Sequence, residues 1–281
     1  RTAYSSPIQI STDATWKFPP SGGSHTAETQ VLVKTDGTLW SWGYNQNGLL
    51  GQNSPISTHL SSPTQIPGTN WNIAVTGRNN AFGIKTDGTL WTWGNNYRGV
   101  FGTNQAHDAK VSSPVQVPGT TWDKIYSSNT FASAIKTDGT LWVWGTNYLG
   151  VLGQNQTSNQ NHRSSPTQIP GTTWAHVGSG SENKLLATKT DGTLWGWGSG
   201  YYGGLGQNTA YPSGFTYSSP VQIPGTDWDY SSDYKIGNAD HATFAIKNNG
   251  ELWSLGYNSQ GGLGQNNRIE YSSPVQIGSG T

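Results

Sequence analysis

The segment KTDGTLWTWG, residues 85–94, recurs in closely similar form five times along the chain. Its copies begin at Lys34, Lys85, Lys136, Lys189 and Lys247, so successive copies are 51, 51, 53 and 58 residues apart. A second motif, SSPxQ followed by Ile or Val, begins at Ser5, Ser61, Ser112, Ser164, Ser218 and Ser272. A fixed period of about 50 residues indicates stacked copies of one supersecondary unit, none of which buries its apolar face alone.

Within one unit the sequence pattern predicts four short strands, at residues 72–76, 81–85, 90–93 and 112–117. Asp87-Gly88 lies in the turn between the second and third of these strands. Asp-Gly between two alternating segments is typical of a type I′ hairpin, in which both central residues have positive φ. Pro114 has no N–H to donate, so the last strand is expected at a sheet edge.

Units of this kind predict an all-β fold, a β-propeller of about five four-stranded blades built from repeats of 51–58 residues. A β-solenoid is the main alternative, although its coils are usually shorter. No linker interrupts the repeats, so we expect a single domain over residues 1–281. The units lie near 5–60, 61–111, 112–163, 164–217 and 218–271, with an extra terminal strand at 272–281.

Six SSP motifs accompany only five hairpins, so one terminal strand is surplus in a closed five-bladed ring. If each blade starts at the tryptophan after the Pro-Gly turn, the surplus strand is Ser5–Ile10. If each blade starts at the SSP motif, it is Ser272–Ile277. An unpaired strand edge is a template for another chain, so we expect self-assembly through this terminal strand.

The composition narrows the classes of partner. Charged residues make up 11% of the chain, against about 25% in typical soluble domains. The 15 Lys and Arg balance the 15 Asp and Glu, which argues against nucleic-acid binding and a polybasic membrane anchor. No apolar run of about 18 residues is present, so no membrane insertion is expected. Cysteine and methionine are both absent, which favours an extracellular or virion-surface location.

A family resemblance rests on the segment that follows each hairpin. The five copies are WGYNQNGLLGQN, WGNNYRGVFGTN, WGTNYLGVLGQN, WGSGYYGGLGQN and LGYNSQGGLGQN, starting at residues 42, 93, 144, 197 and 255. They resemble the WG-x-N-xx-G-x-LG signature of regulator of chromosome condensation repeats, in the variant found in bacterial and phage proteins. The resemblance implies a β-propeller, mostly of seven blades in that family. The family's eukaryotic founder exchanges guanine nucleotide on a small GTPase and binds chromatin, but the residues for that activity have no match here.

The abundant tryptophans and the aspartates of the hairpins have a structural explanation. All 14 tryptophans occupy repeat positions, either in the WxW strand or after the inter-blade turn, which favours blade packing over ligand binding. Asp36, Asp87, Asp138 and Asp191 occupy hairpin turns. The six histidines form no pair with metal-ligand spacing, and no catalytic motif is present. A calcium site at Asp227, Asp229, Asp233 and Asp240 is the alternative to a solvated loop. We therefore expect no enzyme, no catalytic residues, no cofactor and no metal.

Function is expected where the repeats differ, because binding residues concentrate on loops. The first variable set follows the WG motif, and its rim candidates are Tyr97, Arg98, Tyr148, Leu149, Tyr201 and Tyr202. The second set precedes the SSP motif and contains His107-Asp108, Gln156–Arg163 and Tyr211–Phe215. One hypothesis is a non-enzymatic extracellular or virion-surface propeller for adhesion or assembly. The alternative is a soluble regulator, inhibitor-like or exchange-factor-like, that uses the rim. Either would bind a protein or glycan through these loops.

Overall fold

Each repeat forms one antiparallel sheet in the computed structural model, which describes residues 7, 9–17, 28–105, 107–128, 130–157, 161–178, 183–208, 215–238 and 241–278. We number the sheets blades 1 to 5. Blade 1 contains β1 (Thr29–Val33), β2 (Leu39–Gly43) and β3 (Leu60–Ile66). Blade 2 contains β4 (Trp71–Thr76), β5 (Asn80–Lys85), β6 (Leu90–Asn95) and β7 (Lys110–Gln116). The four strands predicted in this unit are therefore confirmed.

The remaining blades repeat this order. Blade 3 contains β8 (Trp122–Ser127), β9 (Phe131–Lys136), β10 (Leu141–Gly145) and β11 (Arg163–Ile169). Blade 4 contains β12 (Trp174–Gly178), β13 (Lys184–Lys189), β14 (Leu194–Ser199) and β15 (Thr216–Ile223). Blade 5 contains β16 (Ile236–Asn238), β17 (Ala242–Ile246), β18 (Leu252–Gly256) and β19 (Tyr271–Gln276). In blade 1, a bridge from Trp16 to Lys34 marks the position of the fourth strand.

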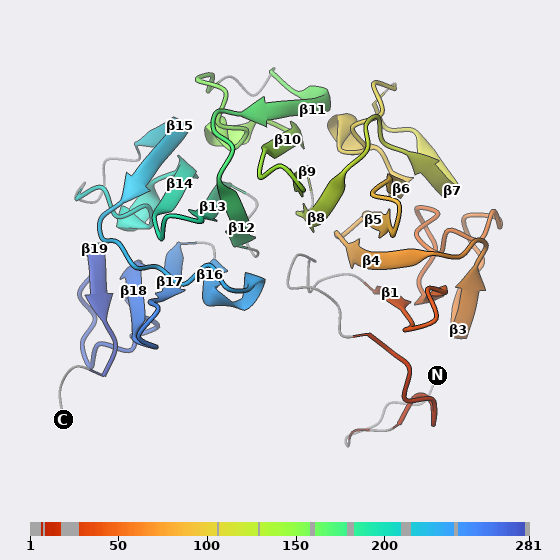
Figure 1. Cartoon of the computed structure of the whole chain (residues 1–281), viewed down its shortest axis with the longest axis horizontal. Helices are drawn as coiled ribbons and strands as arrows, with labels where there is room; N and C mark the ends of the chain where they lie inside the picture. The colour runs from red at the N-terminus through yellow and green to blue at the C-terminus, as the bar shows by residue number, and fades with distance from the viewer. Residues whose placement is uncertain are drawn as a thin grey trace.

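Consecutive blades pack side by side around a common axis (Figure 1). β1 contacts β4, β5 contacts β8, β9 contacts β12 and β12 contacts β16. Figure 1 shows the described sheets along an arc that leaves an opening between blade 1 and blade 5. The expected five-bladed ring is therefore not closed by the described strands.

Every sheet ends, rather than begins, with its SSP strand, which is an edge strand as predicted. The repeat units drawn at the SSP motifs are thus offset from the blades, and the surplus motif is Ser5–Ile10. Of this motif the structure describes Pro7, Gln9 and Ile10, which lie outside any strand. Ile10 is 65% exposed, whereas the equivalent Ile66 at the end of β3 is fully buried.

The hairpin turn differs from the predicted type I′. Among its residues Gly88 has a positive φ of 76° and Asp87 does not, and the equivalent glycines have φ of 75–87°. The Gly88 N–H donates to Lys85 O and the Lys85 N–H donates to Thr89 O, which is a type I turn followed by a glycine bulge. The Asp87 carboxylate accepts the Thr89 N–H at 2.9 Å and the Thr89 hydroxyl at 2.6 Å. These bonds explain why this turn prefers Asp followed two residues later by Thr.

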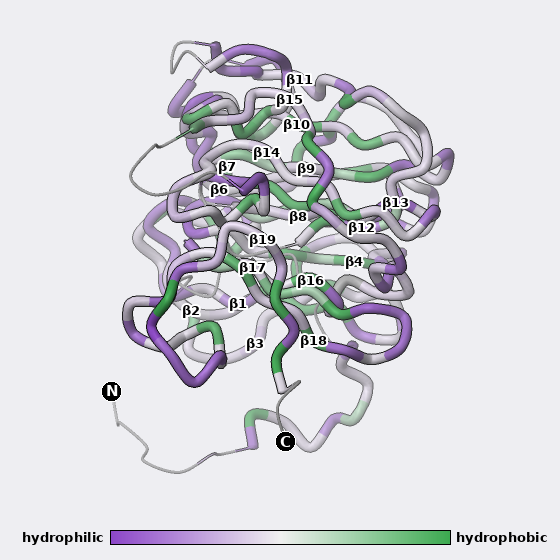
Figure 2. Tube along the Cα trace, turned by 90° about the vertical axis from the view of Figure 1, so that its left-hand side faces the viewer, coloured by the Kyte–Doolittle hydropathy of each residue, from purple (hydrophilic) through white to green (hydrophobic). Residues whose placement is uncertain are grey.

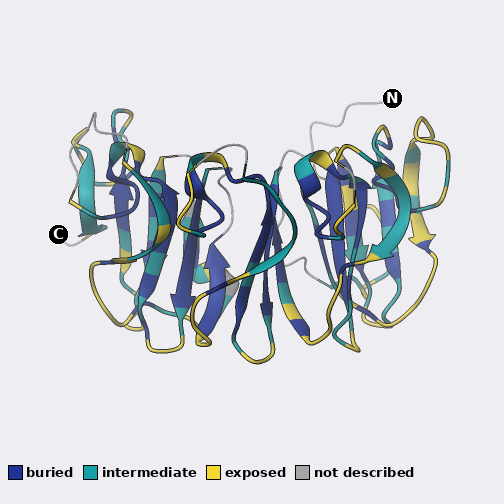
Figure 3. Cartoon of the chain, turned by 90° about the horizontal axis from the view of Figure 1, so that it is seen from above, coloured by how far each residue is buried: buried dark blue, intermediate teal, exposed yellow. Residues whose placement is uncertain are grey.

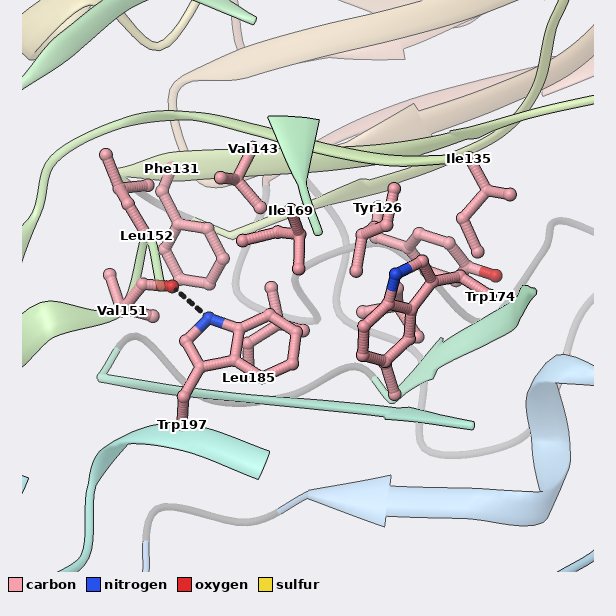
Figure 4. Packing of buried hydrophobic residues seen from close by; sticks show 13 residues of the cluster. Tyr126, Phe131, Ile135, Val143, Val151, Leu152, Ile169, Trp174, Leu185 and Trp197 are labelled. Atoms are coloured by element: carbon pink, nitrogen blue, oxygen red, sulfur yellow. Dashed lines mark hydrogen bonds between the residues drawn. The ribbon is translucent and has the colours of Figure 1, made fainter. Parts of the chain in front are cut away.

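Tryptophan fills the core, as the repeat positions predicted. Trp144 of blade 3 is fully buried and packs edge-on against Trp122 and against Phe82 of blade 2, with ring centroids 6.1 Å apart in both pairs. In the next blade Trp197 occupies the same position (Figure 4). The hydrophobic segments follow the strands (Figure 2). The exposed residues lie mainly in the loops at the two ends of the strands (Figure 3). The core is therefore a chain of inter-blade clusters, as in other repeat proteins.

Tryptophan has a second role that the sequence did not predict. In every blade the lysine that begins the hairpin motif places its ammonium group between two indole rings, 4.1–5.4 Å from their centroids. In blade 2 these groups are Lys85, Trp71 and Trp91. Such cation–π contacts stabilise a charge while covering the indole faces.

Candidate functional site: the loop rim

The loop after each WG motif owes its shape to a few backbone-directed contacts. In blade 2, Gly94 has φ of 104°, which turns the chain out of β6. The Asn96 Oδ1 accepts the Phe101 N–H at 2.9 Å and closes the loop around the 3-10 turn η1 (Tyr97–Gly99). The same bond recurs at Asn45, Asn147 and Asn258. The repeat signature therefore encodes a rigid loop that holds two variable residues.

The first variable residue is an exposed tyrosine in three successive blades. Tyr97 in η1, Tyr148 in η2 (Tyr148–Gly150) and Tyr201 in η3 (Tyr201–Gly203) are 38%, 42% and 40% exposed. Figure 1 draws these turns as short coiled ribbons on the outer side of the arc. The equivalent residues of blades 1 and 5 are Gln46 and Ser259. The tyrosines thus form a row on blades 2 to 4, which we call the tyrosine row.

The second variable residue lies at the junction with the next blade. Arg98, Leu149 and Tyr202 are half-buried and have positive φ of 53°, 52° and 56°. The Tyr202 ring contacts His241 and Tyr257 of blade 5, with centroids 4.8 and 4.7 Å away. Arg98 places its guanidinium 5.0 Å from the centre of the Tyr97 ring. The 3-10 turns that carry these three residues contact β11, β15 and β19 of the next blade.

Two histidines from blades 2 and 3 contact each other. The ring centroids of His107 and His162 are 6.2 Å apart in an edge-on contact, which the sequence did not predict. Burial lowers the pKa of His162 below 6.5, and the positive charges of Arg98 and His107 lower it further. Its Nδ1 is buried without a hydrogen-bond partner among the described residues. Nothing in the linear sequence signals this pair, because the two residues occupy different repeat positions.

Two further basic residues begin strands in these blades, Lys110 in β7 and Arg163 in β11. The Arg163 Nη2 donates to the Gln156 side-chain oxygen at 3.1 Å. No carboxylate of the described residues forms an ion pair with Arg98, His107, Lys110, His162 or Arg163. The described part of the chain also contains no group of three or more His, Asp or Glu arranged to hold a metal ion.

The other candidate loops are only partly described. The Ser231 hydroxyl donates to the Asp229 carboxylate, the Lys235 ammonium lies 2.9 Å from it, and the Ser231 N–H also donates to it; these bonds lower the pKa of Asp229 to about 2. Of the four carboxylates in the calcium alternative, that of Asp229 is thus paired with the Lys235 ammonium. Asp240, residues 158–160 and residues 211–214 lie outside the described residues, whereas Phe215 is exposed.

Comparison with known proteins identifies the repeat. A sequence profile of the regulator of chromosome condensation (RCC1) repeat matches residues 36–77 and 138–183, and a second RCC1 repeat profile matches residues 73–100. The ultraviolet-B receptor UVR8 of Arabidopsis thaliana is 24% identical over 260 residues, which are 91% of this chain and 56% of the receptor. Protein RCC2 of Homo sapiens is 31% identical over 134 residues, 46% of this chain and 25% of RCC2. The chain thus spans 56% of the length of UVR8 and 25% of the length of RCC2.

Solved structures agree on the fold. The crystal structure of human WBSCR16 aligns with a TM-score of 0.69 at 19% identity, over 89% of this chain and 65% of that one. Prp20p of Saccharomyces cerevisiae, in a structure described with its binding properties to Gsp1p and histones, aligns with a TM-score of 0.71 at 16% identity, over 89% of this chain and 61% of that one. Yeast RCC1 (Prp20) in a complex with Kap60 gives a TM-score of 0.72 at 18% identity and covers 59% of that chain.

The blades and their loops define an all-β repeat protein of the propeller class. The chain carries repeats that match the regulator of chromosome condensation repeat at residues 36–100 and 138–183. These comparisons give no support to the extracellular or virion-surface module. Among the described residues, no helix is long and apolar enough to span a membrane.

Proposed function

We propose that this chain is a protein-binding module of regulatory type, without enzymatic activity of its own, that engages its partner through the loop rim. The observation that carries the proposal is the tyrosine row, Tyr97, Tyr148 and Tyr201, three large side chains kept exposed at one repeat position. Tyrosine and arginine are the residues most often found as binding hot spots, because they combine apolar area with directed polar groups.

The rigid loops support this function. Each tyrosine stands on a 3-10 turn held by glycines and, in blades 2 and 3, by an asparagine side chain. A surface fixed in this way loses little conformational freedom on binding, which favours affinity. Prp20p, whose fold this chain shares, is described by its binding to the proteins Gsp1p and histones. From this likeness we therefore infer protein binding for this chain, but not the identity of its partner.

Affinity capture with matched variants tests the proposal. The natural protein, the variant with Tyr97, Tyr148 and Tyr201 changed to Ala, and a control with Tyr230 and Tyr234 changed to Ala are immobilised and exposed to extract from the source organism. The control tyrosines are also exposed but lie outside the rim. A protein captured by the natural chain and the control should bind the rim variant at least about tenfold more weakly. Equal capture by all three, with unchanged circular dichroism, would exclude the tyrosine row as the binding surface.

A further inference from the structure

Three basic side chains meet at the junction between blades 2 and 3, beside the tyrosine row. The ring centroids of His107 and His162 are 6.2 Å apart, and the Arg98 guanidinium lies 5.0 Å from the centre of the Tyr97 ring. Arg98 and His107 both lie close enough to His162 for their charges to disfavour its protonation. The turn η1, which carries Arg98, contacts β11, which begins directly after His162. The three side chains therefore come from three separate segments of two blades.

Backbone hydrogen bonds fix the loop that carries His107 against the base of η1. Asn96, the residue before η1, donates its N–H to Ala109 O at 2.8 Å, and the Asp108 N–H donates to Asn96 O at 3.0 Å. The histidine thus stands next to the turn that holds Tyr97 and Arg98. Its position relative to the tyrosine row is set by the backbone.

His162 occupies a repeat position that the strand register defines. Lys110 and Thr216 pair with the residue after the WG motif of their blades, and the register of blade 3 continues to the same position at His162. Opposite His162 lies Thr146, which is 3% exposed. The Thr146 hydroxyl and the His162 Nδ1 are both buried without a hydrogen-bond partner in the part of the chain that the structure describes. Neither group is therefore used to hold the two blades together.

The charge at this junction is not required by the fold. The next junction, between blades 3 and 4, has Leu149 where blade 2 has Arg98, and Thr216 where blade 3 has His162. Leu149 and Arg98 share one backbone conformation, with φ of 52° and 53°. Because the same position accepts an apolar residue, the charge of Arg98 has a role other than blade packing.

Other side chains join the blades. At three junctions an indole N–H donates to a rim-loop carbonyl of the preceding blade at 2.7–2.8 Å, in the pairs Trp93–Leu49, Trp144–Val100 and Trp197–Val151. Blade 5 has Leu255 in place of the tryptophan, and there the Thr243 hydroxyl donates to Gly204 O at 2.7 Å. The basic side chains of the rim contribute to none of these bonds, so they are free to serve a ligand.

The segments around the histidines carry more basic than acidic groups. Lys110 begins β7, Arg163 begins β11, and the acidic residue among them is Asp108, next to His107. The ion pairs of the described residues include none of these groups, nor Arg98. A carboxylate supplied from outside would therefore meet unpaired positive charge beside an exposed aromatic ring.

We propose that this junction binds a carboxylate-bearing segment of the partner protein, and that its histidines take up protons as the segment binds. The proposal rests on the proposed function, because it names the chemistry of the partner that the loop rim engages. An anion placed among Arg98, His107 and His162 offsets the repulsion between them and favours the charged form of the imidazoles. Binding therefore strengthens as the pH falls from 7.5 to 5.5, where glutamate side chains, with a pKa of about 4.3 in peptides, stay ionised.

A peptide titration of the purified protein tests the proposal. The probe is a synthetic peptide in which glutamates flank a phenylalanine, and the control peptide has glutamines in their place. A bound carboxylate that raises the pKa of one histidine by about one unit increases the affinity by up to about tenfold. The dissociation constant of the glutamate peptide should thus be at least about threefold lower at pH 5.5 than at pH 7.5. The imidazole nuclear magnetic resonance signals of His107 and His162 should move on binding, and those of His59 in blade 1 should not. No binding of the glutamate peptide, or equal binding of the glutamine peptide, would overturn the proposal.

Matched variants separate this site from a general attraction of charge. Arg98→Leu and His162→Thr copy the residues of the next junction, so the fold should tolerate them. Arg98→Leu should weaken the glutamate peptide at least about fivefold at pH 5.5, and His107→Gln combined with His162→Thr should remove the pH dependence. Arg268→Leu, which removes an exposed charge before β19, should change neither. Equal weakening by the two arginine variants, or a pH dependence that persists without the histidines, would overturn the proposal if circular dichroism is unchanged.

This proposal and the proposed function fail separately. A partner captured through the tyrosine row that binds the natural protein equally at pH 7.5 and 5.5 would overturn this inference and leave the proposed function intact. Peptide binding of the expected kind, beside unchanged capture by the variant that lacks the tyrosine row, would support the junction as the site and overturn the role of the tyrosines.

Discussion

Among the contacts between blades, we expect loss of the hydrogen bond from the Trp144 indole to lower the stability of the fold most. Its indole N–H donates to Val100 O at 2.7 Å, and both residues are fully buried. Replacing Trp144 by Phe keeps an aromatic ring against Trp122 and Phe82 but removes the donor and part of the ring. No water can reach the Val100 carbonyl at that depth, so the acceptor is left without a partner.

The expected magnitude follows from two contributions. A buried acceptor that loses its donor costs about 1–3 kcal/mol. The smaller ring leaves a cavity in a site that is fully buried, which adds about 1–2 kcal/mol at roughly 24 cal/mol per Å³. We therefore expect Trp144→Phe to lower the free energy of unfolding by about 2–5 kcal/mol, a large part of the stability of an ordinary domain.

Trp42→Phe is the matched control, because Trp42 occupies the same repeat position in blade 1. Its indole is half-buried and donates to no described acceptor, so in residues 1–281 this change should cost less than about 1 kcal/mol. Urea unfolding followed by far-ultraviolet circular dichroism measures both variants, with the slope checked for a common denatured state. Equal destabilisation by the two substitutions would refute the inter-blade bond as the main source of the effect.

Three further predictions concern titration and binding. The Thr89 hydroxyl and N–H donate to the Asp87 carboxylate and hold its pKa below 3.8. The carboxylate therefore stabilises the fold above about pH 4, and this stabilisation is lost as the pH falls further. Asp87→Asn, which copies Asn249 of blade 5, should reduce the fall in melting temperature that acid causes. Burial holds the pKa of His162 below 6.5, so this residue is protonated at higher pH in the unfolded chain than in the folded one, and stability falls as the pH drops below 6.5. His162→Gln should therefore reduce the decrease in melting temperature between pH 7 and pH 5. Changing Tyr201 and Tyr202 to Ala should weaken partner binding by more than about 1 kcal/mol in titration calorimetry, and unchanged affinity with the fold intact would assign the partner to other loops.

The strands, their order and the structural role of tryptophan were predictable, because each depends on contacts within one repeat. The turn type was not, since Asp87-Gly88 suits both a type I′ turn and a type I turn with a glycine bulge. The choice depends on which residues close the loop, and here Lys85 pairs with Thr89. The local sequence is compatible with both turn types.

Contacts between repeats were harder to predict. His107 and His162 meet because the loops before two successive SSP strands lie next to each other, although the residues occupy different repeat positions. The period of the sequence likewise predicts how many blades there are, but not the angle between them. That angle depends on how closely the inner strands pack, and here it leaves the described blades as an open arc.

The junction between blades 4 and 5 offers a last prediction, because its donor differs from that of the other junctions. Thr243→Ala should cost about 1–3 kcal/mol by leaving Gly204 O unpaired. Leu255→Trp alone should also destabilise, by about 1–3 kcal/mol, because the indole competes with the Thr243 side chain for the same space. The double variant reproduces the Ala81 and Trp93 pair of blade 2 and should recover most of the loss. Urea unfolding of all four proteins gives the coupling energy. Strictly additive losses would mean that the two donors are not interchangeable solutions for the same carbonyl.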